Sequence, residues 1–353
     1  MNNSVEFVLK MFSDCIPVKG YKRGCIYDLN RRSFLYVPNS LIDFLFENEG
    51  KSKQVILNSY SNDDLSKINE YFIFCETNDI IFWIKKELFS NFLKIDLQWD
   101  YPAIISNAII DINSIDKYNI PRTLMKLQKL GCNHIQIRSY VPLRMEQFAS
   151  MLDQFSDSTF LSIEIITKYT SKNSMSGIQL FLRKNKRIKA LIFHSSKKNE
   201  IINERDLNSM GNLVFTKQII KSPIDCHNNS IGYMNVMMEH FTEAQFFHTY
   251  YNRKVAIDSD GNIKNCTSQI ISYGNVETDD IETIISKKEF QKLWFVKKDH
   301  TIVCQDCEYR YMCIDSRVPV KVGPKLWKHN QVCNYNPYEA EWKNVKGLNT
   351  CKI

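Results

Sequence analysis

The sequence contains no run of about 18 uncharged apolar residues, which is what a membrane-spanning helix needs. Its first ten residues also lack the basic segment and the long apolar run of a secretory signal. We therefore expect a cytoplasmic protein with no membrane partner. Thiols stay reduced in that compartment, so the eleven cysteines of the chain are not expected to form a disulfide framework.

Several common enzyme signatures are missing as well. The 353 residues contain no glycine-rich phosphate loop, no G-x-S-x-G nucleophile motif and no His-x-Glu or Glu-x-x-His metal pair with a supporting context. The net charge of +7 favours acidic partners, but the two signs are mixed along the chain and no RNA-binding signature is present. We expect no nucleic-acid partner, and an acidic peptide suits the charge equally well.

Four cysteines near the end of the chain stand out by their spacing. Cys304, Cys307 and Cys313 form a C-x2-C-x5-C triplet, and Cys333 follows after a gap of nineteen residues. Four thiolates at such a spacing can hold a [4Fe–4S] cluster or a closed tetrahedral zinc ion. Zinc ribbons usually use two C-x2-C pairs and only one is present, so we favour one [4Fe–4S] cluster and keep zinc as the alternative.

Other cysteines and acidic residues are interpreted more simply. Asp258, Asp260 and Asp315 are expected to support turns or to pair with nearby basic residues. Six cysteines are widely separated, and we expect each to be a small buried hydrophobe or an unreactive surface thiol. These six are Cys15, Cys25, Cys75, Cys132, Cys226 and Cys351.

Residues 1–95 predict a small separate domain of the winged-helix type. Two helices are expected, the first capped by Ser40 and ended by Gly50, and the second opened by Asp64. An apolar strand at 80–84 closes the domain. Three short β-rich runs are expected to come before the helices, at 15–20, 24–29 and 33–38.

This order of elements, with a Pro-Val-Lys-Gly segment and a hairpin, resembles the leader-recognition domain of enzymes that modify ribosomally made peptides. Such a domain binds an unstructured leader by adding it as a strand to the exposed edge of the hairpin. The resemblance implies a precursor peptide as a partner. Its leader would bind at the hairpin that carries Ile26, Tyr27, Phe34 and Tyr36.

Residues 96–225 alternate between apolar strands and amphipathic helices. Strand starts recur every 24 to 31 residues, and Pro121 and Gly131 mark the two ends of one helix. This cadence predicts βα units joined by right-handed crossovers. The resulting parallel sheet is either open or curled into a partial barrel.

Residues 226–353 begin with a stretch rich in Met and Phe at 233–251, which we expect to be mostly helical. Residues 253–266 alternate around an Asp-Gly pair and predict a β-hairpin. A helix-like segment at 279–295 then leads to the cysteine loop.

The spacing Gly261-x4-Cys266, the cysteine triplet and the late Cys333 together resemble the SPASM domain, which follows a radical S-adenosylmethionine barrel in many peptide-modifying enzymes. The segment from Cys304 to Arg317 is more similar still to the SPASM-domain peptide maturase of grasp-with-spasm systems. That maturase is encoded with an ATP-grasp ligase and a short precursor peptide, so the resemblance implies both as partners. It also implies that the triplet and Cys333 hold the distal iron–sulfur cluster of the domain.

Two motifs of the radical enzymes are absent. These enzymes carry a C-x3-C-x2-C motif after the first barrel strand. After the second strand they carry a Gly-Gly-Glu-Pro turn, which binds S-adenosylmethionine. The corresponding segments here, 108–118 and 138–144, contain neither motif. We therefore expect a degenerate barrel that neither binds S-adenosylmethionine nor performs standard radical chemistry.

The second cluster of the SPASM domain also lacks most of its ligands. Cys266 is the cysteine that remains of that set, and His248 stands near the place of an earlier ligand. These two residues are the candidate remnants of a second site. A lone histidine beside Phe246 and Phe247 is more often structural, so we expect one metal site.

Together these features predict an α/β protein with a winged-helix-like leader-binding domain, a degenerate partial βα barrel and a C-terminal SPASM domain. We expect it to capture a precursor peptide and to support its modification together with an ATP-grasp ligase. Two alternatives stay open. One is a catalytically competent radical or redox enzyme that uses the SPASM cluster, and the other is a zinc-binding structural partner.

Overall fold

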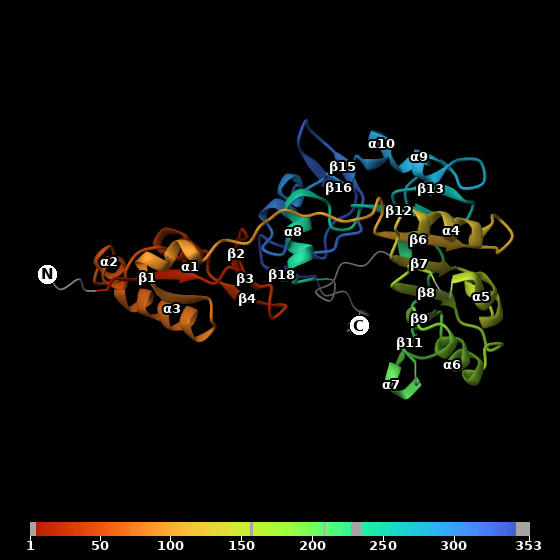
Figure 1. The fold of residues 1–353 in the computed structure, drawn as a ribbon, viewed down its shortest axis with the longest axis horizontal. Coiled ribbons are helices and arrows are strands. Elements are labelled where there is room, and N and C mark those ends of the chain that lie inside the picture. Colours follow the sequence, from red (N-terminus) through yellow and green to blue (C-terminus); the bar gives the residue numbers. More distant parts are fainter. Residues whose placement is uncertain (1–4, 156–157, 208, 227–233, 344–353) are drawn as a thin grey trace.

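The region of the cysteine loop lies between the N-terminal domain and the large sheet, to which the chain between 254 and 285 also contributes (Figure 1). The computed structural model describes residues 5–155, 158–207, 209–226 and 234–343, so Cys351 lies outside the described residues. Figure 1 shows the N-terminal helices at one end of the long axis and the large sheet with its helices at the other. The region that contains the cysteine loop lies between them and contacts both.

The N-terminal region has its own apolar core. Leu9, Leu45 and Phe72 are among its most deeply buried side chains. Its strands β1 and β5 pair antiparallel along their whole length. The elements around this core are β1 (Phe7–Met11), α1 (Asn39–Asn48), α2 (Lys53–Asn58), α3 (Leu65–Thr77), β5 (Ile81–Lys85) and the 3-10 turn η1 (Lys86–Asn91).

Three details of this region differ from the sequence prediction, and one of them is the short helix α2, which was not expected between the two predicted helices. The prediction that three strands come first is wrong, because β1 precedes them. This strand has no alternating pattern, since Lys10 is buried between apolar neighbours and pairs with Glu49 at 2.8 Å. Ser40 is not the N-cap, because α1 begins one residue earlier, and the Ser40 hydroxyl lies 2.7 Å from that of Tyr71.

The three predicted strands between β1 and α1 are confirmed. They form a separate antiparallel sheet in which β3 is central and β4 is an edge. Within the described ranges, β4 pairs with β3 alone. The strands are β2 (Cys15–Lys19), β3 (Gly24–Asp28) and β4 (Ser33–Val37).

A nine-stranded sheet forms the other end of the molecule. Its order is β10-β11-β9-β8-β7-β6-β12-β13-β14, so the sheet is open. The central strands pair in parallel, as predicted, and the last two and β10 are antiparallel. The strands are β6 (Asn107–Ile112), β7 (His134–Ser139), β8 (Ser162–Lys168), β9 (Ile188–His194), β10 (Glu200–Ile202), β11 (Asn212–Phe215), β12 (Lys254–Ile257), β13 (Asn262–Lys264) and β14 (Gly274–Asn275).

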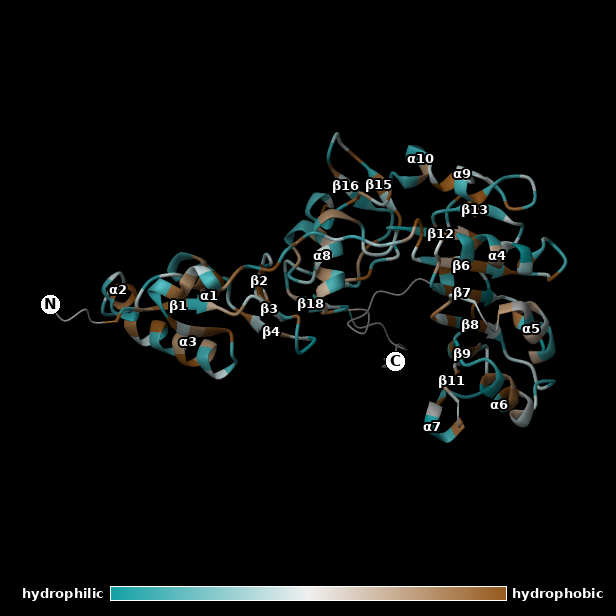
Figure 2. Cartoon of the chain, in the orientation of Figure 1, coloured by the Kyte–Doolittle hydropathy of each residue, from teal (hydrophilic) through white to brown (hydrophobic). Residues whose placement is uncertain are grey.

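Helices between the parallel strands cover one side of this sheet (Figure 1). The predicted ends of α4, the first of these helices, are confirmed. At its start, Asn119 accepts the Arg122 N–H at 2.9 Å and Pro121 lies in the first turn. At its end, Gly131 follows with φ +80°. Figure 2 shows hydrophobic residues through β6, β8 and β9, which belong to the main core. The helices are α4 (Ile120–Lys129), α5 (Met145–Leu152), α6 (Met175–Lys184) and the short α7 (Glu204–Leu207), with 3-10 turns η2 (Asp153–Phe155) and η3 (Pro223–Cys226).

The large sheet runs across the expected domain boundary at residue 225/226. Strand β12 pairs in parallel with β6, and the predicted Asp-Gly hairpin follows as β12 and β13. The stretch 233–251 is helical only in α8 (Met238–Phe246), and residue 233 is outside the described residues. None of the described helices is long and apolar enough to cross a membrane.

Short elements build the region between the two ends. The Ile302 N–H donates to the carbonyl of Trp327, at the start of β16, at 2.8 Å, and this bond holds the hairpin beside the cysteine loop. The remaining elements are α9 (Ile281–Ile285), α10 (Lys288–Gln291), η5 (Lys298–His300), η6 (Cys304–Asp306), β15 (Pro319–Lys321), β16 (Trp327–His329), β17 (Tyr335–Asn336) and β18 (Glu341–Trp342).

The three-stranded sheet packs directly on the cysteine loop. The Tyr27 hydroxyl donates to the carbonyl of Glu308, and the Arg310 guanidinium donates to the carbonyl of Lys19 at 2.6 Å. Gly20 is required by this close approach, because a Cβ there would lie 2.8 Å from the backbone nitrogen of Glu308. The Tyr309 side chain is buried in the same contact.

A buried carboxylate lies at the centre of the contact. Glu308 is fully buried, and its Oε1 accepts from Arg23 Nε at 2.9 Å and from the Tyr335 hydroxyl. The guanidinium of Arg23 also lies 3.6 Å from the centre of the Tyr36 ring. The Arg23–Glu308 pair therefore joins the N-terminal sheet to the cysteine loop, and the Tyr36 ring adds an edge-on contact to that of Tyr309, with ring centres 6.2 Å apart.

We expect Arg23→Ala to lower the free energy of unfolding by about 3 kcal/mol, because it leaves the Glu308 carboxylate buried without its cation. Urea denaturation followed by tryptophan fluorescence measures this change. The control is Lys22→Ala, which removes an exposed charge from the neighbouring position and should change the free energy by less than about 0.5 kcal/mol. Equal stabilities of the two variants would contradict the importance of this ion pair.

Candidate metal centre

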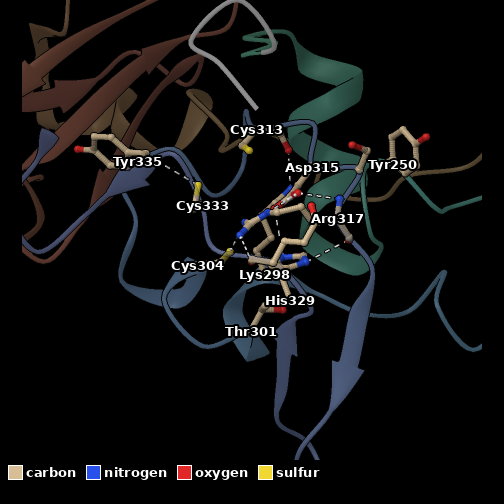
Figure 3. Close-up of polar contacts among 12 residues, drawn as sticks. Tyr250, Lys298, Thr301, Cys304, Cys313, Asp315, Arg317, His329, Cys333 and Tyr335 are labelled. Carbon is tan, nitrogen blue, oxygen red and sulfur yellow. Dashed lines mark hydrogen bonds and ion pairs between the residues drawn. The ribbon is translucent and has the colours of Figure 1, made fainter. Parts of the chain in front are cut away.

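The four predicted cysteines line one cavity. Cys304, Cys307, Cys313 and Cys333 all contribute to its wall, although they come from η6, the following loop and the segment before β17. Figure 3 shows Cys304, Cys313 and Cys333 around one space next to Arg317. The structure therefore brings together the four thiols that the spacing singled out.

Local backbone turns place these thiols. Val303 has φ +72° and turns the chain into η6. The Cys307 N–H then donates to the carbonyl of Cys304 at 3.1 Å, and the Cys313 N–H donates to that of Tyr309 at 2.9 Å. The loop is thus folded by short-range hydrogen bonds, and its side chains turn inward.

The spread of the thiols suits a cluster better than a single ion. A tetrahedral zinc ion with Zn–S of about 2.3 Å holds its sulfurs about 3.8 Å apart. Among the described residues, no three of the four cysteine sulfurs lie within 4.8 Å of one another. Four thiols spaced more widely around a cavity fit the larger [4Fe–4S] core, whose sulfurs are separated by four irons.

Burial favours the protonated form of three of these thiols, those of Cys304, Cys307 and Cys313, in the absence of a metal. It raises the pKa of Cys313 to about 12 and the pKa of Cys304 and Cys307 well above the usual range. Lys298 and Arg317 act in the opposite direction on Cys304 and Cys313. Binding of metal would therefore have to displace protons from the thiols, which makes assembly of the site dependent on pH.

A buried polar network lies beside Cys304. Arg317 donates to Asp315 through Nε at 3.0 Å and through Nη2 at 2.6 Å, and the same Nη2 lies 4.0 Å from the Cys304 sulfur. The expectation that Asp315 pairs with a nearby basic residue is confirmed, as it is for Asp258 with Lys264 at 2.8 Å.

His329 lies beside this network and forms, with Cys304 and Asp315, a group of three possible metal ligands. Its Nδ1 donates to the carbonyl of Arg317 at 3.1 Å, and its Nε2 lies 3.1 Å from Asp315 Oδ2. Cys304, Asp315 and His329 place one donor atom each within 4.8 Å of one another, a set that zinc could use. The guanidinium of Arg317 already contacts two of these three residues, so we interpret the group as polar support for Cys304.

Burial lowers the pKa of His329 to about 4, although the Asp315 carboxylate acts against this. For Asp315, burial would raise the pKa, but His329 and Arg317 outweigh it and hold the pKa far below its usual range. Asp315 is therefore a buried carboxylate that pairs with the Arg317 guanidinium.

The two candidate remnants of a second site lie close by. His248 is buried, with its ring 4.8 Å from that of Tyr251 and 6.3 Å from that of His329. Cys266 is buried in the same cluster as Tyr251, and its sulfur lies 3.1 Å from the Ser268 hydroxyl. In the part of the chain that the structure describes, neither belongs to a group of three donor residues close enough to hold one metal ion.

A buried ion pair occupies the strand ends where the radical motifs are missing. Arg138 on β7 donates to both oxygens of Asp111 on β6, at 2.6 and 3.0 Å. The Tyr140 hydroxyl donates to Asp111 at 2.7 Å, and Arg138 also donates to Thr267. Both charged side chains are almost fully buried, so they neutralise each other inside the protein.

Sequence reasoning missed the charged residues around the cysteines. Asp315 was expected to pair with a basic residue, but its partner Arg317 was not identified, and Lys298 and His329 gave no signal. The one available clue was the pair Asp315 and Arg317 directly after the triplet, because two opposite charges beside metal-binding thiols often belong to the site.

The comparisons with known proteins agree with a metal-binding role for this region. Residues 250–308 match the SPASM family, described as an iron-sulfur cluster-binding domain. This match contains Cys266, Cys304 and Cys307. A search of curated proteins finds no match.

Three crystal structures of SuiB from Streptococcus suis are similar to the chain. The structure described as SuiB alone is 11% identical, covers 86% of this chain and 94% of that chain, and has a TM-score of 0.35. SuiB bound to S-adenosylmethionine is 10% identical, with coverage of 91% and 99% and a TM-score of 0.31. SuiB bound to precursor peptide SuiA is 10% identical, with coverage of 86% and 94% and a TM-score of 0.28. These TM-scores are low, so we draw no conclusion from the likeness.

His240 on α8 is a further buried group near the cysteine loop. Its Nε2 has no hydrogen-bond partner among the residues that the structure describes. Burial, with a smaller contribution from Lys298, lowers the pKa of His240 to about 3. The unfolded chain, with an ordinary histidine pKa, binds a proton that the folded chain does not between about pH 6.5 and pH 3, so the folded state loses stability as the pH falls through this range.

We expect His240→Phe to reduce the loss of unfolding free energy between pH 7.5 and pH 5 by about 2 kcal/mol, because the group that must be protonated on unfolding is gone. Urea denaturation at the two pH values measures it. His300→Gln removes an exposed histidine and should leave the loss unchanged. If both variants behave like the parent protein, His240 is not a source of the acid sensitivity.

Proposed function

We propose that the protein is a cytoplasmic SPASM-domain peptide maturase of the grasp-with-spasm type. It binds the leader of a ribosomally made precursor peptide and supports its modification together with an ATP-grasp ligase. One observation carries the proposal: the loop that holds the four cysteines is also the loop on which the three-stranded sheet docks, and β4 leaves an edge of that sheet unpaired in the described structure. Metal binding and peptide capture would thus share one structural support.

The metal part of the proposal is one [4Fe–4S] cluster at Cys304, Cys307, Cys313 and Cys333. The match of residues 250–308 to an iron-sulfur family and the wide spread of the thiols support it. A cluster with four protein thiolates has no open position, so it would supply structural support or electron transfer. Zinc at the same thiols is the alternative.

The peptide part of the proposal places the leader as a fourth strand beside β4. Leu35 and Tyr36 on this strand are 37% and 43% exposed, and Phe34 is partly exposed. Ile26 and Tyr27 are buried on the central strand, so they would support the hairpin rather than touch the leader. Main-chain hydrogen bonds would provide affinity, and these exposed side chains would provide selectivity.

In this proposal residues 1–95 bind the leader, residues 96–225 form the scaffold, and residues 226–353 bind the metal and also complete the scaffold sheet through β12, β13 and β14. The buried Asp111–Arg138 pair supports a scaffold role for the middle unit, because it fills the strand ends with a neutralised pair. A protein that modified its precursor with S-adenosylmethionine and a reductant, without the ligase, would instead be a competent radical enzyme.

Anaerobic purification followed by iron, sulfide and zinc analysis tests the metal site. We expect about four irons and four sulfides per chain. Cys307→Ser should lose most of the iron. Cys15→Ser should keep it, because Cys15 lies in the core of the N-terminal region and a serine can make the same hydrogen bond to the carbonyl of Asp79. Zinc alone in the parent protein would refute the cluster.

Binding of a labelled leader peptide tests the β4 edge. The probe is the leader of a short precursor encoded beside the gene, followed by fluorescence anisotropy. Leu35→Asp should weaken binding roughly tenfold, because a charge at an exposed apolar position disfavours the added strand. Val55→Asp, at an exposed site on α2, should bind like the parent protein. Equal affinities of the two variants would place the leader elsewhere.

A further inference from the structure

Two buried cations line the four-cysteine cavity. The side chains of Lys298 and Arg317 belong to its wall, and each residue is only 6% exposed. Charged side chains are seldom buried to this degree without a partner of opposite charge. Their placement at the thiols therefore needs an explanation.

Lys298 has neutral protein partners. Its Nζ donates to the Thr249 hydroxyl at 3.0 Å and to the carbonyl of Cys313. Across residues 5–155, 158–207, 209–226 and 234–343, no carboxylate lies within ion-pair distance of this ammonium group. Its positive charge is thus left to act on the adjacent cavity.

The Arg317 guanidinium contacts both a carboxylate and a thiol. It holds Asp315 with two hydrogen bonds, and the same Nη2 lies 4.0 Å from the Cys304 sulfur. The carboxylate of Asp315 and the side-chain cations of Arg317 and Lys298 together carry one net positive charge. This charge lies against a site that becomes negative when it is filled.

We propose that Lys298 and Arg317 are the counter-charges of the cluster and raise its reduction potential. The inference rests on the proposed function, because it needs a [4Fe–4S] cluster on the four cysteines. Such a cluster with four thiolates carries a net charge of about −2 and gains one further negative charge on one-electron reduction. Buried positive charges favour the more negative state, and so does the N–H group that faces the Cys304 sulfur.

A purely structural role makes a different prediction. Lys298 joins the segment after α8 to the cysteine loop, and Arg317 orders the loop through Asp315 and the carbonyl of Gln331. If the two cations only hold the loop together, their loss lowers stability or cluster content and leaves the potential of the remaining cluster unchanged. The reduction potential therefore separates the two roles.

The experiment is a spectroelectrochemical titration of the anaerobically purified protein, with dithionite as the one-electron reductant. Lys298→Met and Arg317→Gln should each lower the ratio of reduced to oxidised cluster at a fixed potential by roughly tenfold, which is about 59 mV. Asp315→Asn removes the negative charge of the network and should shift the potential in the opposite direction. Lys288→Met, which removes an exposed charge on α10, should leave the potential unchanged.

The cation substitutions and Asp315→Asn are expected to shift the reduction potential in opposite directions. General damage to the protein would not produce this pattern. Shifts of one sign in all three network variants, or no shift in any of them, would overturn the inference while the cluster itself stands. If Arg317→Gln does not retain iron, Lys298→Met and Asp315→Asn still decide the question. Zinc, or no metal, in the parent protein would instead overturn the proposed function before any titration is made.

Discussion

The contact between the three-stranded sheet and the cysteine loop is the constraint on which the centre of the molecule depends. The loop has little regular structure of its own, with one turn of 3-10 helix and two-residue strands. Its shape is set by residues between the cysteines, above all Glu308 and Tyr309, which are buried against the N-terminal sheet. A loop held on one side by a protein surface and on the other by a metal is ordered by both.

A second buried charge pair acts in the same way at the other end. Asp111 and Arg138 join two neighbouring parallel strands, and Thr267 links them to the chain that follows β13. A pair of this kind is costly to break from one side, because the remaining charge is left in the core. Each end of the molecule is therefore joined to the last third of the chain by a buried charge pair, through Glu308 at one end and through Thr267 at the other.

Much of this architecture follows from local sequence signals. The helix between Pro121 and Gly131, the Asp-Gly hairpin and the four spaced cysteines were all predicted, because each depends on neighbouring residues. Strand β1 was missed because Lys10 is buried there, and its partner Glu49 is far away in the sequence. Lys298 and His329 were missed for the same reason: they reach the cysteines from separate segments, and only the folded chain brings them together.

The return of the chain to the large sheet has a consequence for how the protein can be divided. After β11 the chain leaves the sheet, forms α8, and comes back as β12 beside β6. Removing all residues beyond 225 would remove β12 from its place beside β6. The backbone N–H and C=O groups on that side of the buried strand β6 would then be unpaired and able to bind a strand of another chain. The metal-binding region is therefore not a detachable module of this chain, and gene fusions or recombination events that preserve folding should keep the sheet and the cysteine loop together.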